Sequence, residues 1–131
     1  MIKYVSIKTE NPVSIIDITD RVSAIVSAYD IDEGICLVYA PHTTCGITIN
    51  ENADPDVRHD MIRELSQVVP FDDGYLHMEG NSAAHIKASL MGSSVTVPIS
   101  QGTLLLGTWQ GIYFCEFDGP RTRHITIQIL S

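Results

Sequence analysis

The stretch SVTVPISQGTLLLGTWQGI, residues 94–112, carries the clearest structural signal in the chain. Its first part alternates between apolar and polar side chains, which is typical of a half-buried β-strand. It then becomes rich in glycine and ends at Gly107-Thr108-Trp109-Gln110-Gly111, around the chain's single tryptophan. Glycines at this spacing indicate a backbone that closely approaches another surface, and we expect the Trp109 indole to pack over that gap.

Working outward from this stretch, β-strands dominate both ends of the chain and helices gather in its middle. Alternating patterns bounded by turn residues predict strands, whereas apolar residues three and four apart predict helices. Thr19 and Asp54 are the expected N-caps, and residues 41–44 are expected to join two strands as an antiparallel hairpin. The strands predicted are residues 2–9, 13–18, 34–40, 45–51, 95–99, 103–106, 112–117 and 122–130, and the helices are residues 20–29, 55–69 and 82–91.

The order of these elements favours an antiparallel α+β fold over a sheet wound from βαβ units. Many strands and only about three short helices leave one sheet face without cover from its own chain. We therefore expect a homo-oligomer that buries this face.

Length and composition predict one globular domain, residues 1–131, since 44% of the side chains are hydrophobic and 18% are charged. No apolar run reaches the roughly 18 residues of a membrane span, and the alternating N-terminus MIKYVSIKTE does not resemble a signal peptide. We expect a soluble, cytoplasmic protein with no membrane partner. The net charge of -8 argues against a nucleic-acid partner, because binding a phosphate backbone requires a basic surface.

Three histidines occur in polar segments that folding alone does not explain. His42 lies at the expected bend, and His77 and His85 lie on either side of a helix start. They are candidate metal ligands or acid and base catalysts, with a locally hydrogen-bonded structural role as the alternative for each. Neither an HExxH motif nor paired CxxC motifs accompany them. Cys45 is a candidate ligand or nucleophile beside His42, but a small buried thiol that fills the core is favoured.

Acidic and small residues mark two further candidate sites. Glu51 and Asp54 follow a strand and precede a helix, where carboxylates can hold Mg²⁺ against phosphate groups. Helix capping is the alternative for Asp54. Asn81 and Ser82 begin a helix that carries Lys87, and this pattern suits an anion, although Ser82 also qualifies as a simple N-cap. Arg121, in the turn Asp118-Gly119-Pro120-Arg121, is a second phosphate ligand or a solvated charge.

Taken together, these segments resemble the YjbQ family, whose members are called secondary thiamine-phosphate synthases. The likeness extends over nearly the whole chain. In the first stretch it rests on Ser94, Val97, Ile99, Gly102, Gly107-Thr108-Trp109-Gln110 and Ile112. The other similar segments are His42-Thr43-Thr44, residues 48–55, residues 79–87 and residues 118–121.

The resemblance implies an α+β fold that contains a sandwich of β-sheets and assembles as a homotrimer with sites near subunit boundaries. It also implies a thiamine phosphate synthase-like transferase, which joins hydroxymethylpyrimidine diphosphate to thiazole phosphate and releases pyrophosphate. In some members this activity is secondary to another, physiological one. Relatives often have alanine at the position of Cys45, which argues against an obligatory thiol nucleophile.

A metal-assisted departure of pyrophosphate fits this reaction, with Mg²⁺ held near Glu51 and Asp54. Three histidines, His42, His77 and His85, are the candidate proton donors, orienting groups or alternative metal ligands, and zinc on His42, Cys45 and His85 is the alternative ion. Trp109 either stacks on a heterocycle or fills the core. The residues expected to bind the small phosphorylated substrate are Thr43, Asn81, Ser82, Lys87, Gln101, Thr108, Trp109, Gln110 and Arg121.

Two other functions stay open at the level of sequence. One is a metal-dependent phosphohydrolase in which the histidine, cysteine and carboxylate groups bind zinc or manganese and activate water. The other is a noncatalytic trimer that binds a small anionic metabolite.

Overall fold

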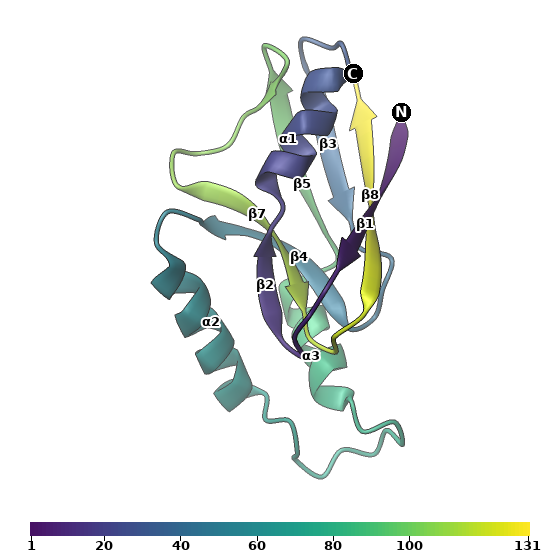
Figure 1. The fold of residues 1–131 in the computed structure, drawn as a ribbon, viewed down its shortest axis with the longest axis vertical. Helices are drawn as coiled ribbons and strands as arrows, with labels where there is room; N and C mark the ends of the chain where they lie inside the picture. The colour runs from purple at the N-terminus through teal and green to yellow at the C-terminus, as the bar shows by residue number, and fades with distance from the viewer.

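Two antiparallel sheets and three helices make up the computed structural model, which describes all residues from Met1 to Ser131 (Figure 1). The α+β class, the antiparallel sheets and the three helices are as predicted. In chain order the elements are β1 (Ile2–Lys8), β2 (Ser14–Asp17), α1 (Thr19–Ala28), β3 (Gly34–Tyr39), β4 (Cys45–Glu51), α2 (Pro55–Val68), α3 (Ser82–Met91), β5 (Ser94–Ser100), β6 (Thr103–Leu104), β7 (Gln110–Glu116) and β8 (Thr122–Leu130).

The larger sheet has the strand order β1-β8-β3-β5-β6, and the smaller sheet has the order β2-β7-β4. The main hydrophobic core lies between them and is closed on one side by α1. Alternate residues of each strand point into it, as the two-residue period requires. Its fully buried members include Ile18, Val22, Val26, Cys36, Val38, Ile47, Ile112, Phe114, Ile125 and Ile127.

The predicted hairpin between residues 34–40 and 45–51 is wrong. β3 pairs with β5 and β8 in the larger sheet, whereas β4 pairs only with β7 in the smaller one. Both strands have one apolar face, and these faces meet across the core instead of lying edge to edge. Residues 41–44 therefore cross from one sheet to the other, which places His42 and Thr43 at the rim of the sandwich.

The start of α1 also differs from the prediction. Thr19 is the first helical residue, not the N-cap, because its hydroxyl accepts the backbone N–H of Ile112 in β7 at 2.9 Å. The N-cap is Ile18, which provides no side-chain hydrogen bond, and the carboxylate of the preceding Asp17 accepts the backbone N–H of Thr19 at 2.9 Å. This arrangement ties α1 to the smaller sheet.

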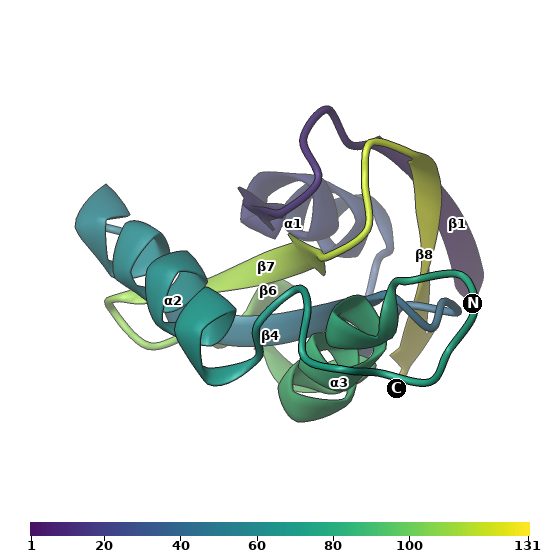
Figure 2. The ribbon, with the colours of Figure 1, turned by 90° about the horizontal axis from the view of Figure 1, so that it is seen from below.

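The outer face of the smaller sheet is covered by α2 and α3, so that β4 and β7 lie between these helices and α1 (Figure 2). α3 approaches β4 very closely at Gly46, where a Cβ atom would lie 2.6 Å from the carbonyl oxygen of Gly92. Only glycine permits this approach, which sets the position of α3 beside the sheet. α2 is less deeply packed, and its predicted inner residue Val68 is exposed.

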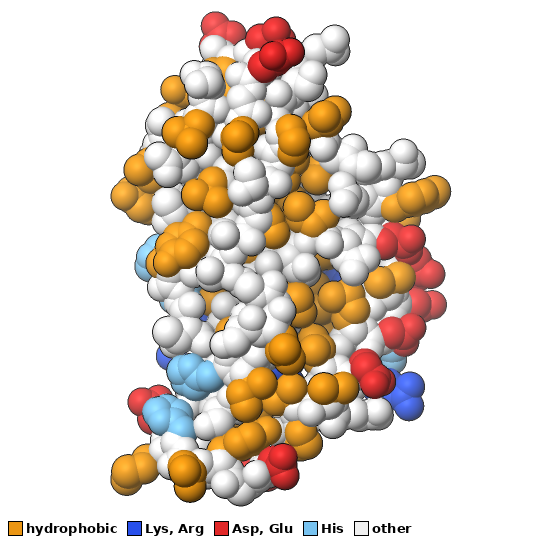
Figure 3. Space-filling model, turned by 180° about the vertical axis from the view of Figure 1, so that it is seen from behind, with side chains coloured by type: hydrophobic (Ala, Val, Ile, Leu, Met, Phe, Trp, Pro, Cys, Tyr) orange, Lys and Arg blue, Asp and Glu red, His pale blue; other side chains and the backbone are white.

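The outer face of the larger sheet has no helix over it, as predicted. Tyr4, Ile35, Tyr39 and Leu130 are exposed there, and Figure 3 shows hydrophobic side chains spread widely over this side of the molecule. No helix of the protein is both long and apolar enough to cross a membrane.

The opening stretch, residues 94–112, forms β5, β6 and the approach to β7. A Cβ atom on Gly111 would lie 2.5 Å from the side-chain amide of Asn52, so the predicted close approach is confirmed. The predicted packing of the indole is wrong, because Trp109 is 63% exposed. Asn52, not the tryptophan, fills the space over the glycine.

Candidate functional site

A polar cleft of 440 Å³ opens at one end of the sandwich. Three chain segments build it, namely the crossover after β3, the approach to α3 with its first turn, and the turn between β7 and β8. Pro41 is its one nonpolar residue. The others are His42, Thr43, Thr44, His77, Glu79, Asn81, His85, Asp118, Arg121 and Arg123.

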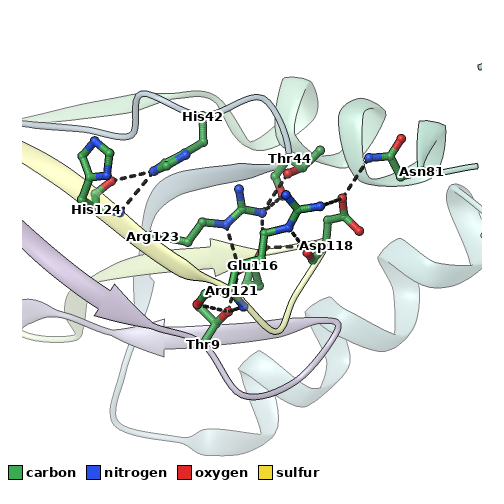
Figure 4. Close-up of polar contacts among 9 residues, drawn as sticks. All are labelled: Thr9, His42, Thr44, Asn81, Glu116, Asp118, Arg121, Arg123 and His124. Atoms are coloured by element: carbon green, nitrogen blue, oxygen red, sulfur yellow. Dashed lines mark hydrogen bonds and ion pairs between the residues drawn. The ribbon is translucent and has the colours of Figure 1, made fainter. Parts of the chain in front are cut away.

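The floor of the cleft is held by a buried ion pair between Glu116 of β7 and Arg123 of β8, which belong to different sheets (Figure 4). Two arginine nitrogens bind the two carboxylate oxygens, with Nε to Oε1 at 2.9 Å and Nη2 to Oε2 at 2.5 Å. Arg123 also donates to the Thr44 hydroxyl at 2.8 Å. A bidentate pair of this kind joins the two sheets in one orientation.

A chain of hydrogen bonds links Glu116 to Arg121, the second arginine of the cleft. The Glu116 carboxylate accepts the Thr9 hydroxyl at 2.7 Å and the backbone N–H of Asp118 at 3.1 Å. Thr9 in turn accepts the backbone N–H of Arg121 at 2.9 Å, and the Arg121 guanidinium donates to the Asp118 carboxylate at 2.9 Å. Both arginines are thus positioned from one buried carboxylate.

Both members of the buried pair are charged. Burial alone would raise the pKa of Glu116, but hydrogen bonds from Arg123, Thr9 and the Asp118 amide outweigh it and lower that pKa overall. The hydrogen bond to Glu116 raises the pKa of Arg123 against the opposing effect of burial. Because Arg123 is neutralised by its partner, the half-exposed guanidinium of Arg121 is the cation most accessible to a ligand.

The histidines of the cleft form two edge-to-face contacts. His42 packs against His124 with ring centroids 4.9 Å apart, and its Nε2 lies 3.0 Å from the His124 carbonyl oxygen. Burial lowers the pKa of His42, so this ring is neutral at pH 7. His77 and His85 meet with centroids 5.3 Å apart and planes at 87°. Two imidazoles at one wall can donate, accept or transfer protons to a bound ligand.

Asn81 has an unsatisfied acceptor. Its side-chain amide donates to Asp118 at 2.9 Å, but its Oδ1 atom is buried and has no hydrogen-bond partner within the chain. Leaving a buried acceptor unpaired costs about 1–3 kcal/mol. Because Asn81 lines the cleft, a ligand N–H or O–H group is a suitable partner for it.

The structure brings six of the predicted site residues to this one cleft. They are His42, Thr43, His77, Asn81, His85 and Arg121.

A second group of predicted residues lies at the opposite end of β4, roughly 20 Å away by the rise of a seven-residue strand. There Glu51 pairs with Gln110 across β4 and β7, beside Thr108 and Trp109. Asp54 accepts the backbone N–H of Asp56 at 2.9 Å, which confirms the capping alternative. Within one subunit these residues do not reach the cleft.

The other three candidates occupy separate places. Gln101 lies in the β5–β6 turn with a φ of 53°, away from the cleft. Ser82 is the first residue of α3 and not its N-cap, which is Asn81, and it faces a neighbouring hollow. Lys87 is 6% exposed and makes no hydrogen bond or ion pair. Burial lowers the pKa of Lys87.

The chain does not arrange three or more histidine, cysteine or acidic side chains as a metal site. The predicted zinc set of His42, Cys45 and His85 is therefore not assembled within one subunit. Cys45 belongs to the core, and burial raises its pKa to about 11, which keeps it a thiol. The predicted buried state of all three cysteines is confirmed.

Several residues of the site were absent from the predicted set. Glu116 and Arg123 hold the floor of the cleft in place, and Thr44, Glu79 and Asp118 line it. A signal for the first two exists in the sequence. Arg123 precedes Ile125, Ile127 and Ile129 on the buried face of β8, and Glu116 follows Ile112 and Phe114 on that of β7. A charge in such a series indicates a buried ion pair.

Comparison with known proteins identifies the family. The family model described as "UPF0047 protein YjbQ-like" matches residues 3–131. The chain belongs to the YjbQ family.

Two relatives in this family are similar over all or nearly all of their lengths. UPF0047 protein YugU of Bacillus subtilis is 53% identical over 132 residues, which cover all of both chains. UPF0047 protein MJ1081 of Methanocaldococcus jannaschii is 51% identical and is covered to 94% of its length. The names of these proteins specify no activity, so they establish the family alone.

Solved structures of the family have the same fold. A YjbQ/UPF0047 protein of Clostridium acetobutylicum is 54% identical, with a TM-score of 0.96 over 98% of this chain and 99% of that one. A protein of Sulfolobus solfataricus is 33% identical, with the same TM-score over 100% and 96%. The fold class predicted from sequence is therefore that of the YjbQ family.

Proposed function

We propose that the protein is an enzyme that binds a small phosphorylated substrate in the cleft and promotes departure of a phosphate or diphosphate group. The observation that carries the proposal is the convergence of Arg121, His77 and His85 on one polar cleft from separate segments. A transferase of the thiamine phosphate synthase type, implied by the family resemblance, is the reaction that we assign. In such an enzyme this activity can be secondary to the physiological one.

Binding of the diphosphate would rest on Arg121 and the groups around it. Its guanidinium is already oriented by Asp118, and phosphate oxygens can share its remaining N–H donors. Thr43 contributes a hydroxyl at the same wall. In a chain with a net charge of -8, this local cation is needed to attract a polyanion against the overall field.

Cleavage in this reaction breaks the C–O bond between the pyrimidine methylene and the diphosphate. The bonding electron pair leaves with the diphosphate oxygen, and an imidazolium of His77 or His85 donates a proton to it. The lone pair of the thiazole nitrogen then forms the new C–N bond. No protein nucleophile takes part, in agreement with the burial of Cys45.

Mg²⁺ fits this scheme as an ion carried by the substrate. Mg²⁺ usually binds one or two carboxylates, several waters and substrate phosphates instead of a full protein cage. Glu79 is the cleft carboxylate that makes no hydrogen bond or ion pair, whereas Asp118 is engaged by Arg121 and Asn81. When bound, the ion would neutralise charge on the departing diphosphate.

We further propose that the protein is a homotrimer in which Glu51 of one subunit approaches the cleft of the next. The exposed apolar face of the larger sheet supports assembly, because a face of this kind is normally covered. Closed symmetry gives every subunit the same contact. At such a subunit interface, the Glu51 end of β4 in one subunit can lie beside the Cys45 end of β4 in the next, although a single subunit keeps its own two ends apart.

The assay of the proposal combines hydroxymethylpyrimidine diphosphate, thiazole phosphate and Mg²⁺ and measures thiamine phosphate. We expect turnover that is lost in His85→Gln and kept in His59→Gln, whose histidine is exposed on α2 outside the cleft. Product no greater than in a control without enzyme contradicts the synthase assignment. Release of phosphate by water alone, with a stoichiometric metal, identifies a phosphohydrolase, and tight binding without turnover identifies a carrier.

Mixing two inactive variants tests whether neighbouring subunits share a site. His85→Gln and Glu51→Gln are each expected to be inactive as pure proteins. After unfolding and refolding together in equal amounts, roughly a quarter of the sites would combine an intact His85 with an intact Glu51 from a neighbour. Recovered activity supports the shared site, and a mixture as inactive as its components contradicts it.

A further inference from the structure

A second hollow, of 560 Å³, adjoins the polar cleft and differs from it in character. Tyr75, Leu76 and Ile86 give it an apolar surface, and Ser82 supplies a hydroxyl. His77 and His85 line both this hollow and the polar cleft. The two spaces are therefore one continuous surface divided by a pair of imidazole rings.

The apolar part of this surface is held in place from two sides. Tyr75 is fixed through its hydroxyl, which donates to the Pro70 carbonyl at 2.8 Å. Ser82 and Ile86 lie one turn apart on α3, which packs against β4. The Ser82 hydroxyl makes no hydrogen bond within the chain, although it faces the hollow. An apolar surface with a free hydroxyl at its edge suits a flat heterocycle, whose faces are apolar and whose edge is polar.

We infer that this hollow, formed by Tyr75, Leu76, Ser82 and Ile86, binds the ring of a substrate whose phosphate occupies the polar cleft. This inference rests on the proposed function and deepens it, because it places the ring of the substrate on named residues beside the polar cleft. It also gives Ser82 a role in ring recognition instead of phosphate binding. Leu76 is 96% exposed in the free chain, and a bound ring would cover part of it.

The order of the two spaces has a consequence for catalysis. In an ester with one carbon between ring and phosphate, the bridging oxygen lies between the ring and the phosphorus atom. With the ring in the hollow and the phosphate near Arg121, that oxygen falls beside His77 and His85. This is the atom that must accept a proton when its bond to carbon breaks.

The test compares two esters of equal charge, methyl phosphate and benzyl phosphate, by calorimetric titration of the assembled protein. We expect benzyl phosphate to bind about tenfold tighter, as burial of one ring face against apolar groups allows. Ile86→Ser should reduce that preference to less than about threefold while methyl phosphate binds as before. The matched control is Leu90→Ser, one turn further along α3 and outside both spaces, which should keep the full preference.

Three outcomes overturn the inference. They are equal binding of the two esters by the unmodified protein, equal effects of Ile86→Ser and Leu90→Ser, and a changed oligomeric state of Ile86→Ser in size-exclusion chromatography, which would make the hollow a contact between copies. Arg121→Gln separates this inference from the proposed function. It should weaken both esters by the same factor, and if neither ester binds to the unmodified protein, the proposed function fails as well.

Discussion

The two ends of strand β4 carry predicted site residues in very different surroundings. At the Cys45 end, the strand adjoins a cleft whose arginines are held by the buried carboxylate of Glu116. At the Glu51 end, Trp109 and Gln110 are exposed. The hydrogen bonds there hold the backbone and cap the helix, as in the bond from the Tyr113 hydroxyl to the Glu51 carbonyl. The first end holds its side chains in place, whereas the second presents them to solvent.

This difference shows how a preorganised binding site can be distinguished from an ordinary polar surface. Desolvation of a charged pair is costly, so an ion pair in the core persists only with good geometry and further hydrogen bonds. Glu116 has both, since Arg123, Thr9 and the Asp118 amide bind it. Exposed polar side chains have no such cost, so their presence says less about function.

The largest expected effect is on stability at the Cys45 end. Glu116→Leu leaves the Arg123 charge buried without a partner, and we expect a loss of about 3–5 kcal/mol in the free energy of unfolding. Glu51→Leu, at the other end of β4, should change the free energy of unfolding by less than about 1 kcal/mol. Urea denaturation at fixed protein concentration measures both.

The double variant Glu116→Leu/Arg123→Leu sharpens this prediction. With both charges removed, most of the lost stability should return, because an apolar pair of similar volume needs no desolvation of charge. Equal losses in the free energy of unfolding for Glu116→Leu and Glu51→Leu would show that buried interactions stabilise the two ends of β4 to the same extent.

The next effect is on ligand binding. Arg121→Gln should weaken methyl phosphate binding about 10- to 100-fold, as expected for the loss of a charge-assisted hydrogen bond to an anion. Trp109→Ala, at the far end of β4, should leave this affinity unchanged, because the indole lies outside the cleft of its own subunit and offers no charge-assisted hydrogen bond to an anion. Calorimetric titration of the two variants checks the contrast, and a larger loss for Trp109→Ala would reverse the assignment of the phosphate site.

The pH dependence of stability offers a smaller test at the same end. Burial in the folded protein lowers the pKa of His42 below its ordinary value of 6.5. The unfolded chain therefore binds more protons than the folded one at pH values between the folded and the ordinary pKa. Stability is therefore fully present above pH 6.5 and falls as the pH drops through the folded pKa. We expect His42→Gln to flatten this fall, measured by thermal unfolding between pH 7 and pH 5, an interval set by that ordinary value.

His59→Gln is the matched control for this measurement. His59 is exposed on α2 and lies outside the cleft, so its replacement should leave the slope as it is. A slope that is the same in the unmodified protein and in His42→Gln would mean that burial of His42 does not govern this titration. The Glu116 carboxylate has its own window at lower pH, because its folded pKa lies below 4.5.

The smallest expected effect concerns Lys87, which is buried in α3 and belongs to neither end of β4. Burial disfavours its charged form, so Lys87→Met should raise the melting temperature by a few degrees at pH 7. Above the ordinary pKa of 10.5 the gain should vanish, because the unmodified lysine is then neutral in both states. A lower melting temperature for the variant would indicate that an anion or a partner subunit pairs with the ammonium.

Much of the fold follows from local patterns. The strands and helices were predicted within a few residues of their observed bounds, because alternation and helical spacing are properties of neighbouring residues. The crossover at residues 41–44 was missed, since two apolar strands joined by a short turn can pair edge to edge or face each other across a core. The choice between these arrangements depends on distant strands.

For the site, the sequence by itself determined which residue types are available: three histidines, an arginine in a turn and a polar helix start. It also determined the family, through motifs that extend along the whole chain. The tertiary structure decided that His42, His85 and Arg121 share a cleft while Glu51 does not. The reason is physical, because β4 holds its two ends apart and the Glu116–Arg123 pair joins two sheets whose strands come together only in the folded core.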